Sequence, residues 1–322
     1  MIVNIPTPQA LDDVALRLYF SAWSSLIRIR QDFDEVYVPG EDPRPTKGQW
    51  GEEWSEYIQQ YQPELQAVCS VIQQSNELAL KARICAVSPY LLLLNSDPKF
   101  STVGRDIDFS ELRTLDAVDL PAAVNSLCAK ALSDEYVQAY NEIRSLRNKF
   151  AHLGHAGQSF QPEELIALLV RQYVELWNGR PWLKDRVSFA SRTGPAFFHD
   201  GKYSSAVSEV IDELPLIFAA ITKSAFKTLF GISKTTRRYL CHSCIYEATT
   251  RFYDVNLEKS KTAFLKDNVT LHCLMCDEDY EIRRQDCRVD DCKGNVISES
   301  EYSGGDVCHT CGQDQRDSPE DS

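Results

Sequence analysis

The segments CHSC (241–244), CLMC (273–276), CRVDDC (287–292) and CHTC (308–311) determine the fold of the C-terminal part of the chain. Together they hold eight of its 11 cysteines. A two-residue gap between cysteines lets both thiolates of a tight turn reach one tetrahedral ion. The spacing therefore predicts a small module built around two four-cysteine metal sites.

Eight thiolates fit two structural zinc ions, because complete four-cysteine ligation leaves no open position for water. Pairing in chain order gives one site from the first two segments and a second from the last two, and interleaved pairing is also compatible with the spacing. His242, His272 and His309 each adjoin a cysteine and could replace a ligand. The alternative is a set of disulfides, which a reducing cytosol disfavours. The predicted ligands are Cys241, Cys244, Cys273, Cys276, Cys287, Cys292, Cys308 and Cys311.

The charge of the chain is concentrated in this C-terminal part. The 322 residues carry a net charge of −13, and residues 241–322 hold 18 acidic and 9 basic side chains, a net of −9. This balance excludes a uniformly basic nucleic-acid coat protein. The apolar runs at 90–94 and 214–221 are too short to cross a membrane, and the first residues do not resemble a leader peptide. We expect a cytoplasmic protein without a membrane partner.

Apolar residues at three- and four-residue spacing predict that the preceding part is helical. The predicted helices cover 10–30, 64–87, 110–117, 121–132, 134–152, 162–177 and 204–230, with loops at 36–50 and 178–203. Short strands are expected at 269–274 and 295–302. The prediction is a mainly α protein, with an N-terminal helical bundle over 1–235 and a β-rich double zinc-ribbon domain over 236–312. Residues 313–322 are expected to form a disordered acidic tail.

The segment NEIRSLRNKFAHLG (141–154) carries the candidate chemistry. Arg144, Asn148 and His152 are spaced i, i+4 and i+8, so they share one face of a helix, and Arg147 lies beside that row. Arginine can pair with phosphate oxygens, and histidine can move a proton near neutral pH. A cation, an amide and an imidazole at one end of a helix are therefore a candidate site for a phosphodiester.

The stretch RNKFAH, with Arg147, Asn148 and His152, resembles the R-x4-6-H signature of HEPN domains, which are all-helical bundles with this motif near the end of a late helix. The resemblance implies a metal-independent endoribonuclease whose site forms between two protomers of a homodimer. His152 would promote attack of the ribose 2′-OH on the adjacent phosphate, and Arg147 would stabilise the developing charge. The products would be a 2′,3′-cyclic phosphate and a 5′-OH.

The same resemblance, together with the zinc ribbons, implies a toxin or antiphage-defence effector that acts on RNA. Tyr140, Arg144 and Lys149 are candidates for binding the substrate, and Asn148 for orienting it. The zinc module would dock a regulatory protein or a phage-derived trigger. Two alternatives are a non-catalytic HEPN-like adaptor that acts through protein or nucleic-acid contacts, and a transcriptional regulator. The net charge of the zinc module argues against the regulator, because DNA attracts cations.

Overall fold

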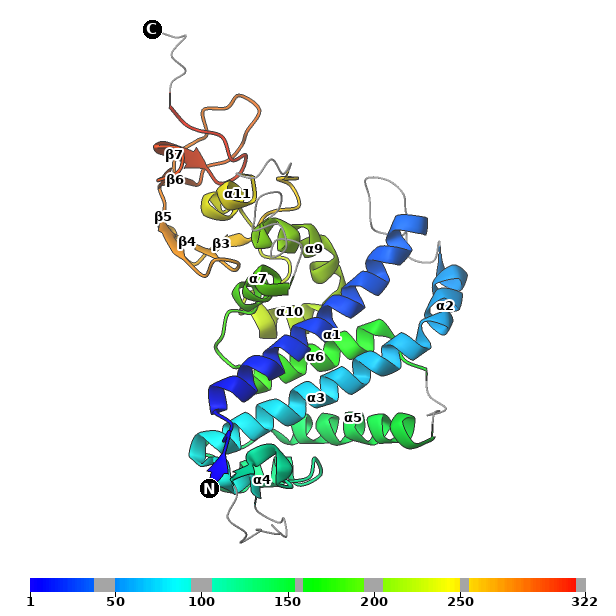
Figure 1. The fold of residues 1–322 in the computed structure, drawn as a ribbon. Helices are drawn as coiled ribbons and strands as arrows, with labels where there is room; N and C mark the ends of the chain where they lie inside the picture. Colours follow the sequence, from blue (N-terminus) through cyan, green and yellow to red (C-terminus); the bar gives the residue numbers. More distant parts are fainter. Residues whose placement is uncertain (38–49, 94–105, 154–158, 194–204, 250–254, 317–322) are drawn as a thin grey trace. The chain divides into compact units, whose positions relative to one another are not determined.

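The computed structural model describes residues 1–37, 50–93, 106–153, 159–193, 205–249 and 255–316, without the side chains of 150–153. The chain divides into two compact units, Met1–Asn178 and Gly179–Ser322. Helices dominate the first unit, and the second combines helices with small strands in its C-terminal half (Figure 1). The predicted combination of a mainly helical part and a small strand-containing cysteine module is confirmed.

The first unit is a bundle in which α1 and α3 lie along one another (Figure 1). The strands β1 and β2 form a short parallel pair. This pairing places the N-terminus beside the segment before α4. Two 3-10 turns lie at Pro89–Leu93 and Phe109–Glu111. The elements are β1 (Ile2–Val3), α1 (Pro8–Tyr37), α2 (Gly51–Gln60), α3 (Gln62–Val87), β2 (Ile107–Asp108), α4 (Leu120–Leu127), α5 (Asp134–Leu153) and α6 (Pro162–Leu176).

Buried side chains repeat along α1 at helical spacing, with Tyr19, Trp23, Leu26 and Ile27 all at most 2% exposed. This stripe packs mainly on α3. A polar bridge fixes the register of the helices within this core. The Ser75 hydroxyl donates to a carbonyl of α1 and accepts a hydrogen bond from a glutamine of α6, each at 2.8 Å. The hydrogen bonds of this buried hydroxyl form only when the three helices keep this register.

In its described residues, the second unit begins with helices and continues into the cysteine module. Its helices are α7 (Trp182–Thr193), α9 (Ala206–Ala220), α10 (Lys223–Phe230) and α11 (His242–Thr249). The strands β3 (Ala263–Leu265), β4 (Thr270–Cys273) and β5 (Asp279–Glu281) form an antiparallel sheet, and β6 (Ile297–Ser300) pairs with β7 (Gly305–Cys308) as a hairpin. Gly304 closes the hairpin turn at a φ of 65°, which favours glycine.

The division after Asn178 differs from the predicted boundary at residue 235, where the composition changes. The physical reason is packing, because α7 and α11 both contact α9 within the second unit. The guanidinium of Arg238 lies 4.5 Å from the ring centroid of Phe218, and the Lys234 ammonium donates to the carbonyl of Ile221. These contacts join the helices 182–230 to the cysteine module rather than leaving a linker between them.

Four local predictions were wrong in part. The helix expected at 110–117 is a single 3-10 turn, and the loop expected at 178–203 contains α7. The helix expected over 204–230 is two helices, because the Thr222 side chain caps the N-terminus of α10 and Ile221 before it is extended. Residues 313–316, expected in the tail, are held by the hairpin, since Gln315 donates its amide to the carbonyl of Asp306.

Within the described ranges, no helix combines the length and the apolar character that crossing a membrane requires.

Candidate metal centres and the helix α5 motif

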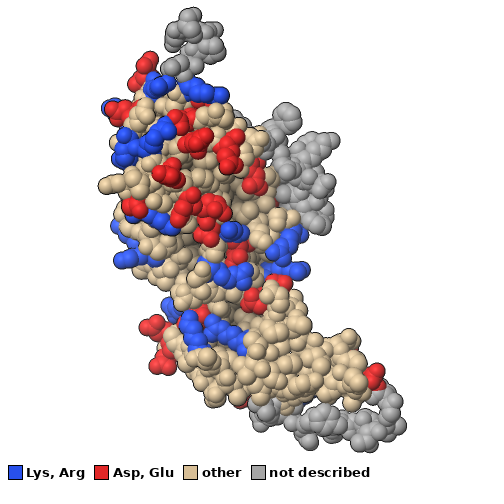
Figure 2. Space-filling view, turned by 90° about the vertical axis from the view of Figure 1, so that its left-hand side faces the viewer, with Lys and Arg blue, Asp and Glu red and all other residues tan. Residues whose placement is uncertain are grey.

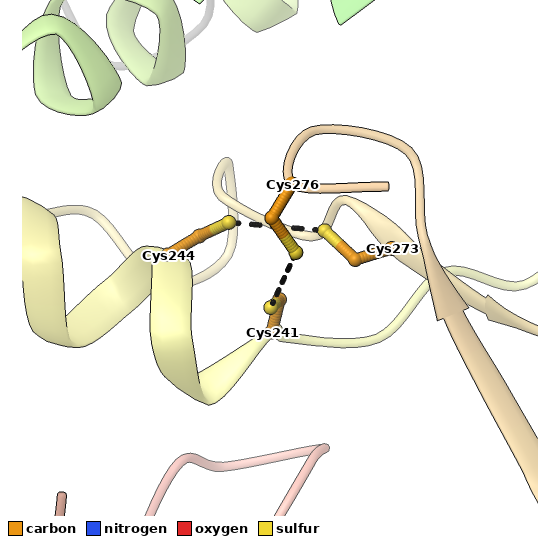
Figure 3. Close-up of side chains that lie close together, drawn as sticks. All are labelled: Cys241, Cys244, Cys273 and Cys276. Atoms are coloured by element: carbon orange, nitrogen blue, oxygen red, sulfur yellow. Dashed lines mark hydrogen bonds between the residues drawn. The ribbon is translucent and has the colours of Figure 1, made fainter. Parts of the chain in front are cut away.

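Cys241, Cys244, Cys273 and Cys276 converge on one point (Figure 3). The first comes immediately before α11, the second lies in the first turn of that helix, and the other two flank the turn after β4. The Sγ atoms of Cys241 and Cys276 are 3.8 Å apart, as are those of Cys244 and Cys273. All four sulfurs lie within 4.8 Å of one another.

The second cluster repeats this arrangement with Cys287, Cys292, Cys308 and Cys311. The Sγ atoms of Cys287 and Cys311 are 3.7 Å apart, and those of Cys292 and Cys308 are 3.9 Å apart. The clusters therefore follow chain order, the first of the two pairings that the sequence allowed.

These distances fit zinc and do not fit disulfides. Four sulfurs at about 2.3 Å from a tetrahedral zinc ion are separated by about 3.8 Å, whereas bonded sulfurs lie about 2.05 Å apart. All 11 cysteines are free thiols in the structure. Each cluster offers four sulfur ligands, which is the donor set of a closed, structural zinc site.

Backbone amides support the sulfurs in a repeated pattern. The amide of the second residue after the cysteine donates to Sγ at Cys273, Cys287, Cys292 and Cys308, at distances from 3.3 to 3.5 Å. Such N–H donors stabilise a thiolate more than a thiol, because the acceptor then carries charge. The four turns are therefore shaped to hold thiolates, the form that binds a metal ion.

Two of the turns close in the left-handed region of the backbone. Gly312 follows the last cysteine with a φ of 78°, and Asp277 follows Cys276 with a φ of 63°. In both turns the amide of that residue donates to the carbonyl of the first cysteine of the pair. Asp277 was missed because aspartate, unlike glycine, does not by itself signal this conformation.

Gly294 lies where the second cluster leaves no room for a side chain. A Cβ atom at this position would lie 2.6 Å from Cβ of Thr310 and 2.8 Å from Sγ of Cys308. Its amide donates to the sulfur of Cys292, and its carbonyl accepts from the amide of Cys287. Gly294 thus contacts the cluster through its backbone, which requires the close approach that only glycine permits.

The three histidines beside the cysteines are not needed as ligands. His309 is buried, with Nδ1 donating to the carbonyl of Leu240 at 2.7 Å and Nε2 lying 2.8 Å from the Ser298 hydroxyl. Burial lowers the pKa of His309 to about 4. Nδ1 of His272 lies 2.7 Å from a carboxylate oxygen of Asp279. Nδ1 of His242 is buried without a hydrogen-bond partner among the described residues.

The helix α5 carries the RNKFAH segment at its C-terminal end, as predicted. Nη2 of Arg147 lies 2.7 Å from Oε1 of Glu77 on α3, and the side chains of this ion pair are 34% and 18% exposed. Gln73, one turn before Glu77, donates to the same oxygen at 3.2 Å. Glu77 was missed by sequence reasoning, because 70 residues separate it from Arg147 and no local pattern joins them.

The other residues predicted at this site differ in their exposure. Lys149 is exposed, whereas Asn148 and Arg144 are half-buried. Nε of Arg144 is buried without a hydrogen-bond partner among the described residues. The backbone of His152 belongs to α5, which extends to Leu153. Its side chain lies outside the described residues.

The prediction that Tyr140 binds substrate was wrong. Its side chain is 1% exposed, and its hydroxyl donates to the carbonyl of Ala117 at 2.7 Å. Burial raises the pKa of Tyr140, so its hydroxyl stays protonated. Tyr140 belongs to the packed face of α5, together with Ile143, and its sequence position alone did not separate this face from the polar one.

Comparisons with protein-family models, with curated proteins and with solved structures gave no match to the chain.

Proposed function

We propose that the chain is an endoribonuclease of the HEPN type, which needs no metal ion for cleavage. His152 promotes attack of the ribose 2′-OH on the adjacent phosphate, and Arg147 stabilises the charge that develops on the phosphate oxygens. Asn148 orients the substrate, while Arg144 and Lys149 attract its backbone. The products are a 2′,3′-cyclic phosphate and a 5′-OH.

The observation that carries this proposal is the state of Arg147 at the end of α5. Its guanidinium is fixed in place by Glu77, and yet its side chain remains one-third exposed. A positioned, accessible guanidinium can form two parallel hydrogen bonds with phosphate oxygens. A second copy of the chain would bring a second motif to the same substrate, and we propose that the active form is a homodimer in the cytoplasm.

We further propose that both four-cysteine clusters hold zinc and that the module they organise docks the partner that controls cleavage. A regulatory protein or a phage-derived trigger fits this role, since the proposed context is a toxin or defence effector. Zinc supplies the cross-link that lets so small a module fold. Because each Zn(Cys)4 centre adds about two negative charges, the module is a poor surface for RNA.

A second candidate function is a non-catalytic adaptor, and one observation favours it. The Arg147 guanidinium already has a carboxylate partner, and an ion pair between α3 and α5 is a sufficient structural role for an arginine. A phosphate would have to compete with Glu77 for this guanidinium. In this alternative the helical part binds another macromolecule and the motif performs no chemistry.

The decisive experiment incubates the zinc-loaded protein with labelled RNA in buffer without added divalent ions, and identifies the new ends by mass spectrometry. Chelators are avoided, because they would remove zinc from the module. We expect His152→Ala and Arg147→Ala to abolish cleavage. Arg113→Ala is the matched control, because Arg113 is an exposed, ion-paired arginine of the same unit. Undiminished cleavage by both His152→Ala and Arg147→Ala would refute the mechanism.

Glu77→Gln separates the two candidates. The glutamine keeps the shape of the side chain and removes the charge that competes with phosphate. A ribonuclease is expected to keep or increase its cleavage rate, because the amide oxygen can still hold the guanidinium by a hydrogen bond while the competing charge is gone. If neither the wild type nor Glu77→Gln cleaves any RNA while both are folded, the adaptor is favoured. Sequencing of RNA ends from cells that express wild type or His152→Ala would then identify the substrate of an active enzyme.

A further inference from the structure

A pocket of about 220 Å³ lies between α11 and the hairpin β6–β7 in the cysteine module. Four rings line it, those of His242, Tyr246, Tyr302 and His309. The rings of Tyr246 and Tyr302 stack with centroids 4.2 Å apart at 24°, and the centroid of His242 lies 6.2 Å from that of Tyr302. The two tyrosines are 45% and 49% exposed, which is unusual for stacked aromatic side chains that only support a core.

The polar atoms of this pocket are arranged to accept hydrogen bonds. The Thr249 hydroxyl donates a hydrogen bond to the carbonyl of Ile245, at 2.8 Å, and the Ser303 hydroxyl donates one to the carbonyl of Gly305, at 3.1 Å. Their remaining lone pairs can only accept. Nδ1 of His242, buried and without a partner in the described part of the chain, is a further polar atom at this site. A ligand rich in N–H donors would satisfy these groups.

The charge at the rim has the sign that suits a cation. Glu301 lies between Ser300 and Tyr302 in the sequence, both of which line the pocket. Glu301 and Glu299 are exposed, and neither forms an ion pair within the described residues.

Two arginines that flank this hairpin in the sequence are neutralised. Arg283 pairs with Asp306, and Arg316 pairs with Asp314. Figure 2 shows acidic side chains gathered on the upper part of the visible face, where the cysteine module lies, with Lys and Arg between them. The stretch 241–322 as a whole has a net charge of −9 before any metal is counted. A phosphate-bearing ligand is repelled by such a surface, and a basic one is attracted.

We propose that this pocket binds the arginine side chain of a basic peptide segment in a partner protein. The guanidinium stacks on the exposed tyrosine rings, donates hydrogen bonds to the acceptors of the pocket, and is balanced by Glu301. This assignment makes the docking role proposed above specific to one site and one chemistry. It does not depend on RNA cleavage by the helix α5 motif, since the two sites use different residues and different readouts.

The test measures binding of a fluorescein-labelled nonapeptide, three repeats of Ser-Gly-Arg, to the zinc-loaded full-length protein by fluorescence anisotropy. We expect Tyr302→Ala to weaken binding by about five-fold or more, the range of a partly desolvated cation–π contact. Tyr302→Phe keeps the ring and is expected to retain binding. Tyr90→Ala is the matched control, because Tyr90 is an equally exposed tyrosine of the other unit.

The contribution of charge is tested with Glu301→Gln, which is expected to weaken binding of the peptide. The control is Glu281→Gln, because Glu281 is an exposed glutamate of β5 outside the pocket, and this variant is expected to bind as wild type does. This isosteric pair keeps the test valid if a tyrosine variant fails to fold. The proposal is overturned if Tyr302→Ala and Glu301→Gln both bind the peptide as tightly as wild type. It is also overturned if a nine-nucleotide oligouridylate binds the pocket more tightly than the peptide, because the ring pair would then be a platform for bases.

Discussion

Adding one methyl group at Gly294 should selectively weaken the second metal centre. The Cβ atom of Gly294→Ala would meet Cβ and Oγ1 of Thr310 at 2.6 Å and Sγ of Cys308 at 2.8 Å. Thr310 cannot turn away cheaply, because its Cβ is attached directly to the backbone and its own amide donates to the same sulfur. Cys308 cannot move without leaving the tetrahedron.

The size of the effect follows from the distances. Ordinary van der Waals contact begins near 3.4 Å, whereas the added carbon would lie 2.6 Å from Thr310. The neighbouring atoms must therefore shift by about 0.8 Å. Forcing an extra carbon into a packed site typically costs about 1–3 kcal/mol. If this cost falls on the metal-bound form, the affinity of the second site for zinc decreases by about 5- to 150-fold. The first cluster has no direct contact with the added methyl group, so its affinity for zinc decreases less.

The assay is a competitive titration of the zinc-loaded protein with a chromophoric chelator, which counts ions per chain and ranks their affinities. Wild type is expected to release two ions at similar chelator concentrations, and Gly294→Ala to release one of them much earlier. Gly51→Ala is the control, because a Cβ at Gly51 meets nothing within 4 Å. If Gly294→Ala holds both ions as tightly as Gly51→Ala, the argument from close approach is wrong.

Three further outcomes are expected. Gly312→Ala places a Cβ at a φ of 78° and should lower the free energy of unfolding of the module by about 1–2 kcal/mol, measured by thermal unfolding of the zinc-loaded protein. Asp277→Gly, at a φ of 63°, should not lower it. Tyr136→Phe deprives the buried Asn76 side chain of a donor at 2.7 Å and should lower the free energy of unfolding in urea by about 1–3 kcal/mol, whereas Tyr90→Phe at the surface should have no effect. Removing zinc with a chelator should expose the region after residue 240 to limited proteolysis while the bundle of the first unit stays resistant; equal digestion of both parts would contradict a structural role for the metal.

The helices that the sequence predicted well are those whose buried residues are apolar at regular spacing. The helix α3 is bounded by Gln62 and Val87 and was expected at 64–87, and α5 and α6 agree as closely. Periodicity was sufficient there because most of the residues that each helix buries are apolar and recur at helical spacing, and the few buried polar residues, such as Ser75, are uncharged. The metal ligands were predictable for a related reason, since two cysteines separated by two residues already specify a local turn.

The helix α7 could not be predicted in this way, because its buried face includes a charge. Arg186 is 4% exposed, and its guanidinium forms two hydrogen bonds with the carboxylate of Glu213 on α9. A buried arginine is stable only with such a partner, and this one lies 27 residues away. Burial raises the pKa of Glu213, while the Arg186 charge lowers it. Local patterns cannot detect a stripe completed by a distant ion pair.

The candidate site on α5 was predicted as a set of residues and not as a set of contacts. The row formed by Arg144 and Asn148 was visible in the spacing, but the spacing did not show that Glu77 binds Arg147 or that Tyr140 is buried. Both facts depend on α3 and on the segment before α4, which the chain brings to α5 only by folding.

The exchange of hydrogen bonds between Leu240 and His309 gives the two metal centres a shared scaffold. Leu240 donates its amide to the carbonyl of His309 and accepts from the ring Nδ1 of the same residue. Leu240 precedes the first ligand of one cluster, and His309 follows a ligand of the other. The first zinc ion to bind therefore orders part of the segment that the second must use, so the two binding events are positively coupled. Half-loaded chains are then scarce, and the module responds to zinc supply over a narrower concentration range than two independent sites would.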